Sequence, residues 1–199
     1  MKAWIDRRFG TWRGLVRSLL AHAELYTGRL APFTLRHPER VRRVVYVCLG
    51  NICRSAYGHH VAVEAGLNVA SLGLSTTTGV GSPAQAVQAA SRNGVDMRAH
   101  RARDYKDFEV RPGDLFLVME VRQAHELRRR LGARDDVQIC LLGLWCKPAM
   151  PHLHDPFTLS DPYFDTCFAR VRAATLNLAR VLPNARASAP ASQASPSHP

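Results

Sequence analysis

The sequence of 199 residues has few cysteines and no long apolar run. Its five cysteines are too few, and odd in number, for the disulfide framework of a small secreted protein, and their spacing matches no zinc site. No stretch approaches the roughly 20 apolar residues that cross a bilayer. The N-terminus also lacks the small-residue cleavage pattern of a secretory signal. These absences favour a protein of the reducing cytoplasm.

Positive charge is abundant and unevenly placed. The formal net charge is +11, and residues 1–43 hold ten Lys and Arg against three Asp and Glu. A basic protein can indicate a nucleic-acid partner, but no basic face of this sequence is interleaved with aromatic residues. We therefore expect no nucleic acid, and most of the excess charge lies ahead of the main domain.

Residues 1–41 read as a basic, amphipathic N-terminal extension. Apolar residues recur there at helical spacing, with Arg13 and Arg17 on other faces of the helix; the apolar set is Trp12, Leu15, Val16, Leu19, Leu20 and Ala23. Two interpretations are open. Either this stripe packs on the domain, or residues 1–40 contact a membrane surface, as basic amphipathic helices with tryptophan do, and place the protein peripherally at the membrane.

Residues 42–182 alternate between strand and helix patterns. Strands are predicted near 43–48, 69–75, 114–119 and 137–142, and helices near 55–66, 83–93, 121–131 and 161–181. Buried-type strands separated by helices predict a single α/β domain, in which a parallel sheet is flanked by helices on both faces. Residues 183–199 are rich in Pro, Ala and Ser without apolar periodicity, which predicts a disordered tail.

The first predicted strand runs into a loop with the strongest chemical signal, which reads Cys48-Leu49-Gly50-Asn51-Ile52-Cys53-Arg54-Ser55. Gly50 permits close backbone approach, and Asn51 tolerates a left-handed conformation. The helix that follows directs its N-terminus at the loop, where free N–H groups favour an anion and a thiolate. Arg54 can donate two hydrogen bonds to a tetrahedral oxyanion. We therefore expect residues 49–55 to bind phosphate and Cys48 to be a nucleophile for phosphoryl transfer.

This loop resembles the Cys-x-Gly-Asn-x-Cys-Arg-Ser signature of the low-molecular-weight protein tyrosine phosphatases of bacterial type. The resemblance covers about residues 42–182, with Ala56 standing where the family usually has proline. It implies a four-stranded doubly wound fold and hydrolysis of phosphotyrosine through a cysteinyl-phosphate intermediate, without metal or cofactor. The segment 141–145 is similar to bacterial members that act on tyrosine kinases of polysaccharide export, so the resemblance suggests such a kinase as the partner.

A general acid must protonate the leaving oxygen, and two Asp-Pro pairs compete for that role. Asp161-Pro162 reads as a helix start with Asp161 as N-cap, which leaves Asp155 free in the preceding loop. The family's acid belongs to an Asp-Pro-aromatic loop, which Asp155 and Phe157 resemble. We therefore predict Asp155 as general acid and, in the second step, as general base.

Several residues are expected to support the loop. Ser55 is placed to hydrogen-bond the Cys48 sulfur, and the resemblance assigns Ser75 and His100, with Asn51, to a network that shapes the loop. Cys53 has two open interpretations: it forms a reversible disulfide with Cys48, or it is a buried packing residue.

Two other functions compete. An arsenate reductase on the same fold needs a relay pair of cysteines, for which Cys140 and Cys146 are the candidates. A non-catalytic, membrane-associated anion-binding adaptor would need neither a nucleophile nor an acid. The combination of Cys48, Arg54 and Asp155 favours the phosphatase over both.

Overall fold

The computed structural model describes residues 1–187. Its centre is a parallel sheet with the strand order β2-β1-β3-β4. The strands are β1 Arg43–Cys48, β2 Val69–Gly73, β3 Asp114–Val118 and β4 Gln138–Leu141. Because all the strands are parallel, their carboxyl ends meet at one edge of the sheet, where open α/β sheets bind their ligands. The predicted fold class is confirmed.

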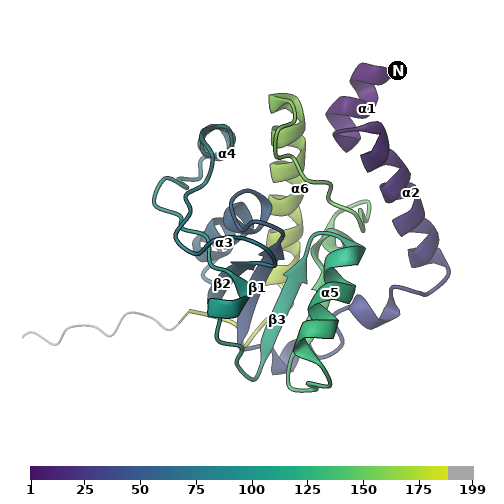
Figure 1. Cartoon of the computed structure of the whole chain (residues 1–199). Helices are drawn as coiled ribbons and strands as arrows, with labels where there is room; N and C mark the ends of the chain where they lie inside the picture. Colours follow the sequence, from purple (N-terminus) through teal and green to yellow (C-terminus); the bar gives the residue numbers. More distant parts are fainter. Residues whose placement is uncertain (188–199) are drawn as a thin grey trace, which may run out of the picture.

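Helices cover both faces of the sheet (Figure 1). They are α3 Arg54–Glu64, α4 Ala84–Arg92, α5 Val121–Leu131 and α6 Asp161–Ala179, with short 3-10 turns η3 Tyr105–Asp107 and η4 Leu142–Trp145. Strands and helices lie within two residues of the predicted bounds. Helices α3, α4 and α6 share one core cluster, whereas α5 belongs to the cluster on the opposite face.

Strand β1 is buried on both faces, which explains its continuous run of apolar residues. Val45 and Val47 face the α5 side. Tyr46 faces α3 and α6, where its hydroxyl donates to Thr175 Oγ1 at 2.8 Å. Gly58 of α3 lies against the Tyr46 ring so closely that a Cβ would overlap it. This close approach fixes the start of α3 directly above the carboxyl end of β1.

The N-terminal extension forms α1 Lys2–Phe9 and α2 Trp12–Tyr26, which run along one side of the domain (Figure 1). The predicted helix exists and packs on the domain, as one of the two interpretations expected, but not through its apolar stripe. Trp12, Leu19 and Leu20 are 64%, 62% and 59% exposed. The opposite face is buried instead, through the small residues Gly14, Ser18 and Ala21. Among the described residues, no helix combines the length and apolarity needed to cross a bilayer.

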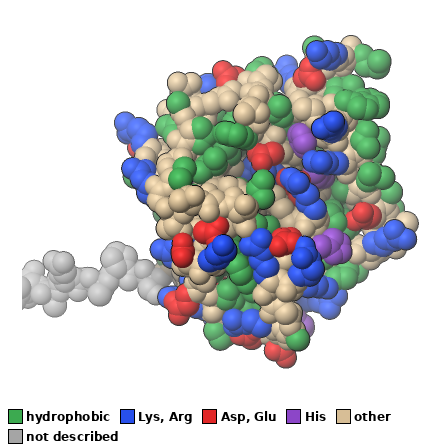
Figure 2. All heavy atoms as spheres, in the orientation of Figure 1, with side chains coloured by type: hydrophobic (Ala, Val, Ile, Leu, Met, Phe, Trp, Pro, Cys, Tyr) green, Lys and Arg blue, Asp and Glu red, His purple; other side chains and the backbone are tan. Residues whose placement is uncertain are grey.

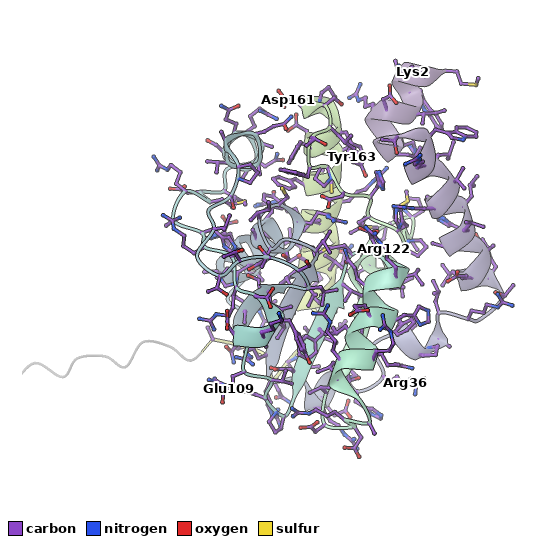
Figure 3. The ribbon with its side chains drawn as sticks, viewed as in Figure 1. Lys2, Arg36, Glu109, Arg122, Asp161 and Tyr163 are labelled. Carbon is purple, nitrogen blue, oxygen red and sulfur yellow. The ribbon has the colours of Figure 1, made fainter. Side chains whose placement is uncertain are left out.

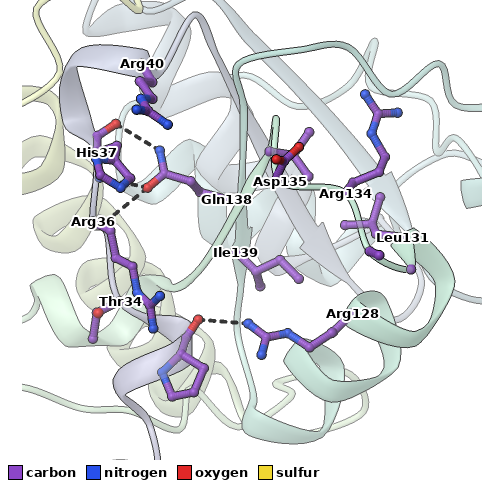
Figure 4. A pocket seen from close by; sticks show the side chains of 14 residues that line it. Thr34, Arg36, His37, Arg40, Arg128, Leu131, Arg134, Asp135, Gln138 and Ile139 are labelled. Carbon is purple, nitrogen blue, oxygen red and sulfur yellow. Dashed lines mark hydrogen bonds between the residues drawn. The ribbon is translucent and has the colours of Figure 1, made fainter.

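The segment between α2 and β1 contains η1 Ala31–Phe33 and η2 Pro38–Arg40 and is fastened to the β4 edge of the sheet. Gln138 Oε1 accepts from the backbone N–H groups of Arg36 and His37 at 3.1 and 2.9 Å. Arg128 donates to the Pro32 carbonyl at 3.0 Å. These groups line a pocket of ≈ 520 Å³ at the amino end of β4 (Figure 4). The pocket therefore lies at the edge of the sheet opposite the loop that follows β1, and its polar groups hold the linker.

The folded domain extends past residue 182, where the sequence predicted a tail to begin. Ala185 is buried, and its carbonyl accepts from Asn68 N–H at 2.9 Å. Arg186 forms a β-bridge with Leu67. This short backbone pairing holds residues 185 and 186 on the domain, although their sequence has no apolar periodicity. The rest of the predicted tail, residues 188–199, lies outside the described residues.

Candidate active site

The loop between β1 and α3 surrounds the sulfur of Cys48, which is 3% exposed. Ser55 Oγ lies 3.0 Å from this sulfur, and the backbone N–H of Asn51 donates to it at 3.2 Å. Asn51 has φ +51°, the left-handed conformation that its residue type tolerates. The turn brings the loop N–H groups and the N-terminus of α3 to the same side as the sulfur, an arrangement that favours an anion.

Asn51 also fixes the shape of the loop through its side chain. Its Nδ2 donates to Ser55 Oγ at 2.9 Å, and its Oδ1 accepts from the Arg103 backbone N–H at 3.0 Å. His100 is buried, and its Nε2 lies 2.9 Å from the Asn51 carbonyl oxygen. Ser75 differs: its side chain is exposed, and its contact with the loop is a backbone N–H bond to the Leu49 carbonyl at 2.9 Å. The structure therefore brings His100 to the loop by its side chain and Ser75 by its backbone.

Glycine at position 73 allows β2 to pass beneath this loop. A Cβ on Gly73 would come within 2.8 Å of the Leu49 carbonyl oxygen and 3.0 Å of the Gly50 carbonyl carbon. Neither contact can relax by moving a flexible side chain. The end of β2 thus supports the loop of residues 48–55 directly, and a larger residue there would deform it.

Arg54 is buried below the loop, with 1% of its surface exposed. Its Nη1 donates to Glu120 Oε1 at 2.6 Å and to the Leu153 carbonyl at 2.8 Å. Its Nη2 lies 2.6 Å from Asp155 Oδ2. Burial opposes the charge, but Asp155 and Glu120 outweigh it and raise the pKa of Arg54 above its ordinary value. Its Nε–H has no hydrogen-bond partner among residues 1–187, and it remains available to an oxyanion.

Glu120 is a site residue that the sequence reasoning missed. It lies two residues after the end of β3, is 1% exposed, and also accepts from Arg122 Nε at 2.7 Å. Burial alone would raise its pKa, but Arg54 and Arg122 lower it, so the carboxylate is ionised. A signal was present, because the carboxyl ends of neighbouring parallel strands meet at one edge and an acid after β3 faces the loop after β1.

The two candidate acids occupy different places. Asp155 is 33% exposed, bonds Arg54, and accepts the Phe157 backbone N–H through Oδ1 at 3.2 Å. Asp161 accepts from Gln85 Nε2 at 2.8 Å, on the surface. The N-cap of α6 is Ser160, with Asp161 as the first helical residue, so the predicted capping position was wrong by one residue. The structure brings Asp155, and not Asp161, to the arginine of the loop.

The residues just before Asp155 are held between α6 and α2. The Tyr163 hydroxyl donates to the His154 carbonyl at 3.1 Å, and Thr11 Oγ1 lies 3.2 Å from His154 Nε2. Gly14 lies against the same ring, since a Cβ there would come within 2.9 Å of His154 Cδ2. Figure 3 shows Tyr163 on α6 and Arg122 at the start of α5, on either side of this segment. The N-terminal extension is thus part of the support of the Asp155 loop.

The other cysteines are free, buried thiols. Burial, with smaller effects from Asp155 and Cys48, raises the pKa of Cys53 well above that of a free thiol. Burial also raises the pKa values of Cys140 and Cys146 to about 11. A relay between thiols requires thiolates, so Cys140 and Cys146 do not suit the arsenate mechanism. In residues 1–187, no group of three or more His, Cys, Asp or Glu is arranged to hold a metal.

Comparison with known proteins identifies the class. The family model described as low molecular weight phosphotyrosine protein phosphatase matches residues 43–188. The chain belongs to this family and is a protein tyrosine phosphatase, a phosphoric monoester hydrolase of bacterial type. The match begins at β1, so α1 and α2 lie outside it.

Individual relatives are also named as tyrosine phosphatases. The probable low molecular weight protein-tyrosine-phosphatase EpsP of Ralstonia nicotianae is 31% identical over 125 residues, which cover 62% of this chain and 79% of the relative. Wzb of Escherichia coli K12 is 26% identical over 141 residues, covering 70% and 94%. Among solved structures, Vibrio vulnificus Wzb in complex with benzylphosphonate is 26% identical with a TM-score of 0.59, covering 70% and 97%. Erwinia amylovora AmsI is 26% identical with a TM-score of 0.57, covering 74% and 95%.

Proposed function

We propose that Cys48 is the nucleophile, that Arg54 and the N–H groups of residues 49–55 bind the phosphate, and that Asp155 is the acid and base. In the first step the Cys48 thiolate forms the S–P bond while the ester P–O bond breaks and Asp155 gives its proton to the leaving phenolate. In the second step Asp155 takes a proton from water, which attacks phosphorus and breaks the S–P bond. Ser55 donates to the sulfur as it leaves.

One observation carries this assignment. A nearly buried thiol, a buried arginine with a free Nε–H and a partly exposed carboxylate converge at the carboxyl end of β1, and Arg54 bonds Asp155 directly at 2.6 Å. If Arg54 served only to hold the fold together, each of its buried N–H groups would be expected to have a hydrogen-bond partner within the protein. A pure anion-binding protein would need no acid beside the thiol.

The proposed substrate is phosphotyrosine in a protein. Leu49 and Phe157 are 43% and 49% exposed, and Ile52 of the loop is partly buried, so apolar groups are available to an aromatic ring. Binding of benzylphosphonate by the Vibrio vulnificus relative supports the same preference. Within this class we propose a tyrosine kinase of polysaccharide export as partner, on the similarity to EpsP, AmsI and Wzb. The enzyme would work in the cytoplasm and peripherally at the membrane, through residues 1–40.

Hydrolysis of para-nitrophenyl phosphate without added metal tests the chemistry. Cys48→Ser should lower turnover roughly a thousandfold or more, because a neutral hydroxyl replaces the thiolate. Cys146→Ser, which changes a buried thiol outside the loop, should stay active. Equal activity of Cys48→Ser and wild type would refute the assignment. Phosphotyrosine peptides should be hydrolysed and phosphoserine peptides of the same sequence should not.

A further inference from the structure

Helix α2 is oriented against the usual rule for a surface helix. Four of its large apolar residues face solvent, namely Trp12, Val16, Leu19 and Leu20, whereas the buried residues Gly14, Ser18 and Ala21 face the domain. Trp4 of α1 is also exposed, at 57%. Figure 2 shows the hydrophobic side chains gathered along the edge formed by α1 and α2, with Lys and Arg among them. We call the exposed set the α1–α2 apolar face; it comprises Trp4, Trp12, Val16, Leu19 and Leu20.

This orientation is fixed by specific contacts with the loop that leads to Asp155. Gly14 leaves room for the His154 ring, and Ser18 Oγ donates to Met150 Sδ at 3.4 Å. His22 Nε2 lies 3.2 Å from the Ala149 carbonyl. Rotating α2 to bury its leucines would break all of these contacts. The exposed apolar face is therefore a fixed surface of the folded protein, and a contiguous patch of this kind indicates an interaction site.

In the described residues this face is exposed, and the remaining residues of the sequence have no large apolar side chain to cover it. Residues 188–199, which the structure does not describe, contain no Leu, Ile, Val, Phe, Trp or Met. A second copy is disfavoured by charge, because residues 1–30 hold six Lys and Arg against two Asp and Glu. Pairing two such faces would bring like charges together. An anionic surface would instead attract them.

We propose that the α1–α2 apolar face binds an anionic lipid bilayer. The helices lie in the plane of the interface, with Trp12, Val16 and Leu19 at the boundary of headgroups and acyl chains. Arg13 is exposed beside them and interacts with lipid phosphates. This proposal names the residues that would make the membrane contact proposed above for residues 1–40. It does not depend on the phosphatase chemistry. Because α2 also packs on the Asp155 loop, docking holds the active site near the membrane plane, where it suits phosphotyrosines close to the bilayer.

Co-sedimentation of the full chain with vesicles tests this proposal. The wild type should pellet with vesicles of phosphatidylcholine and phosphatidylglycerol, weakly with phosphatidylcholine alone, and less as salt rises. Leu19→Ser should lower the partition coefficient roughly tenfold, since most of a leucine leaves the apolar phase. Arg13→Gln should lower it about fivefold on the anionic vesicles. Val63→Ser, which changes an exposed valine on α3, is the matched control and should bind as the wild type does.

Three outcomes would overturn the proposal: no pelleting of the wild type with anionic vesicles, equal pelleting of Leu19→Ser and wild type, or a dimer in solution that Leu19→Ser dissociates. The last would assign the face to a second copy. Hydrolysis of para-nitrophenyl phosphate in the same samples separates the two proposals. An active protein that does not bind vesicles refutes only the docking, and an inactive protein that binds them refutes only the catalytic assignment.

Discussion

Nη2 of Arg54 lies 2.6 Å from Oδ2 of Asp155, so the proposed phosphate-binding cation and the proposed acid are joined directly. The side chain of Arg54 is buried, whereas that of Asp155 is 33% exposed. The ion pair therefore runs from the buried side of the 48–55 loop toward solvent. A substrate phosphate needs the same guanidinium. A phosphate that accepts from both the Nε–H and the Nη2 of Arg54 must therefore release Asp155 from Nη2.

Asp155→Asn should lower kcat for phosphotyrosine peptides roughly a hundredfold or more, because proton transfer to the phenolate is lost. Vanadate should still bind, since Arg54 and the loop amides are unchanged. Asp161→Asn is the matched control and should stay near wild-type activity, because Asp161 bonds Gln85 on the surface. The opposite ranking of the two variants in steady-state kinetics would move the acid to Asp161.

Glu120→Gln should destabilise the protein by about 2–4 kcal/mol, because it removes one partner of a buried ion pair. Affinity for vanadate should also fall, since Arg54 then keeps only the Leu153 carbonyl and Asp155 to orient it. Urea unfolding and vanadate inhibition measure the two effects. Glu126→Gln is the control, because the pairs of Glu126 with Arg129 and Arg130 on the surface of α5 are screened by solvent and should contribute little. Equal stability of the two variants would show that Glu120 does not hold Arg54.

The sequence was sufficient for those parts of the site that depend on neighbouring residues. Strands β1 and β3 contain continuous apolar runs, and the loop of residues 48–55 is a single contiguous segment, so pattern and spacing placed the strands and this loop in the chain. Asp155 was preferred to Asp161 because a helix start is a local feature; the structure places the N-cap at Ser160 and Asp155 beside Arg54, and the role of Asp155 as the acid stays a prediction. In each case the physical cause lies within a few residues of the chain.

The parts that were missed depend on contacts between distant segments. Glu120 reaches Arg54 across 66 positions, through the pairing of β1 with β3. The helical period reveals that α2 has an apolar stripe, but it does not state which face meets the domain. That face is decided by the fit of Gly14 and Ser18 to residues 149–154, which is a tertiary property.

Stability should fall as the pH drops from about 6.5 to about 4 through the histidine cluster of His59, His60 and His100. Burial, followed by the charges of His60 and His100, lowers the pKa of His59 to about 4. At a pH between about 4 and about 6.5, His59 is protonated in the unfolded chain but not in the folded chain. Unfolding is therefore favoured as the pH falls. His59 should account for roughly 1–3 kcal/mol of this loss.

Urea unfolding at several pH values checks this contribution. The slope of stability against pH should be smaller in His59→Gln, whatever the absolute stability of that variant. His37→Gln replaces an exposed histidine at the N-cap of η2, outside this cluster, and is the matched control. An unchanged slope in His59→Gln would mean that this ring is not held neutral by burial.

Thr11→Val should impair the acid step selectively, because Thr11 contacts His154, the residue before Asp155. Para-nitrophenolate leaves without much help from an acid, whereas the phenolate of tyrosine requires protonation. We therefore expect kcat to fall severalfold more for phosphotyrosine than for para-nitrophenyl phosphate. Thr11 also caps α2 through the Gly14 N–H, so a stability loss of about 1 kcal/mol should accompany the change. Thr27→Val at the other end of α2 is the control, and an equal kcat loss on both substrates in Thr11→Val would reduce the role of Thr11 to stability alone.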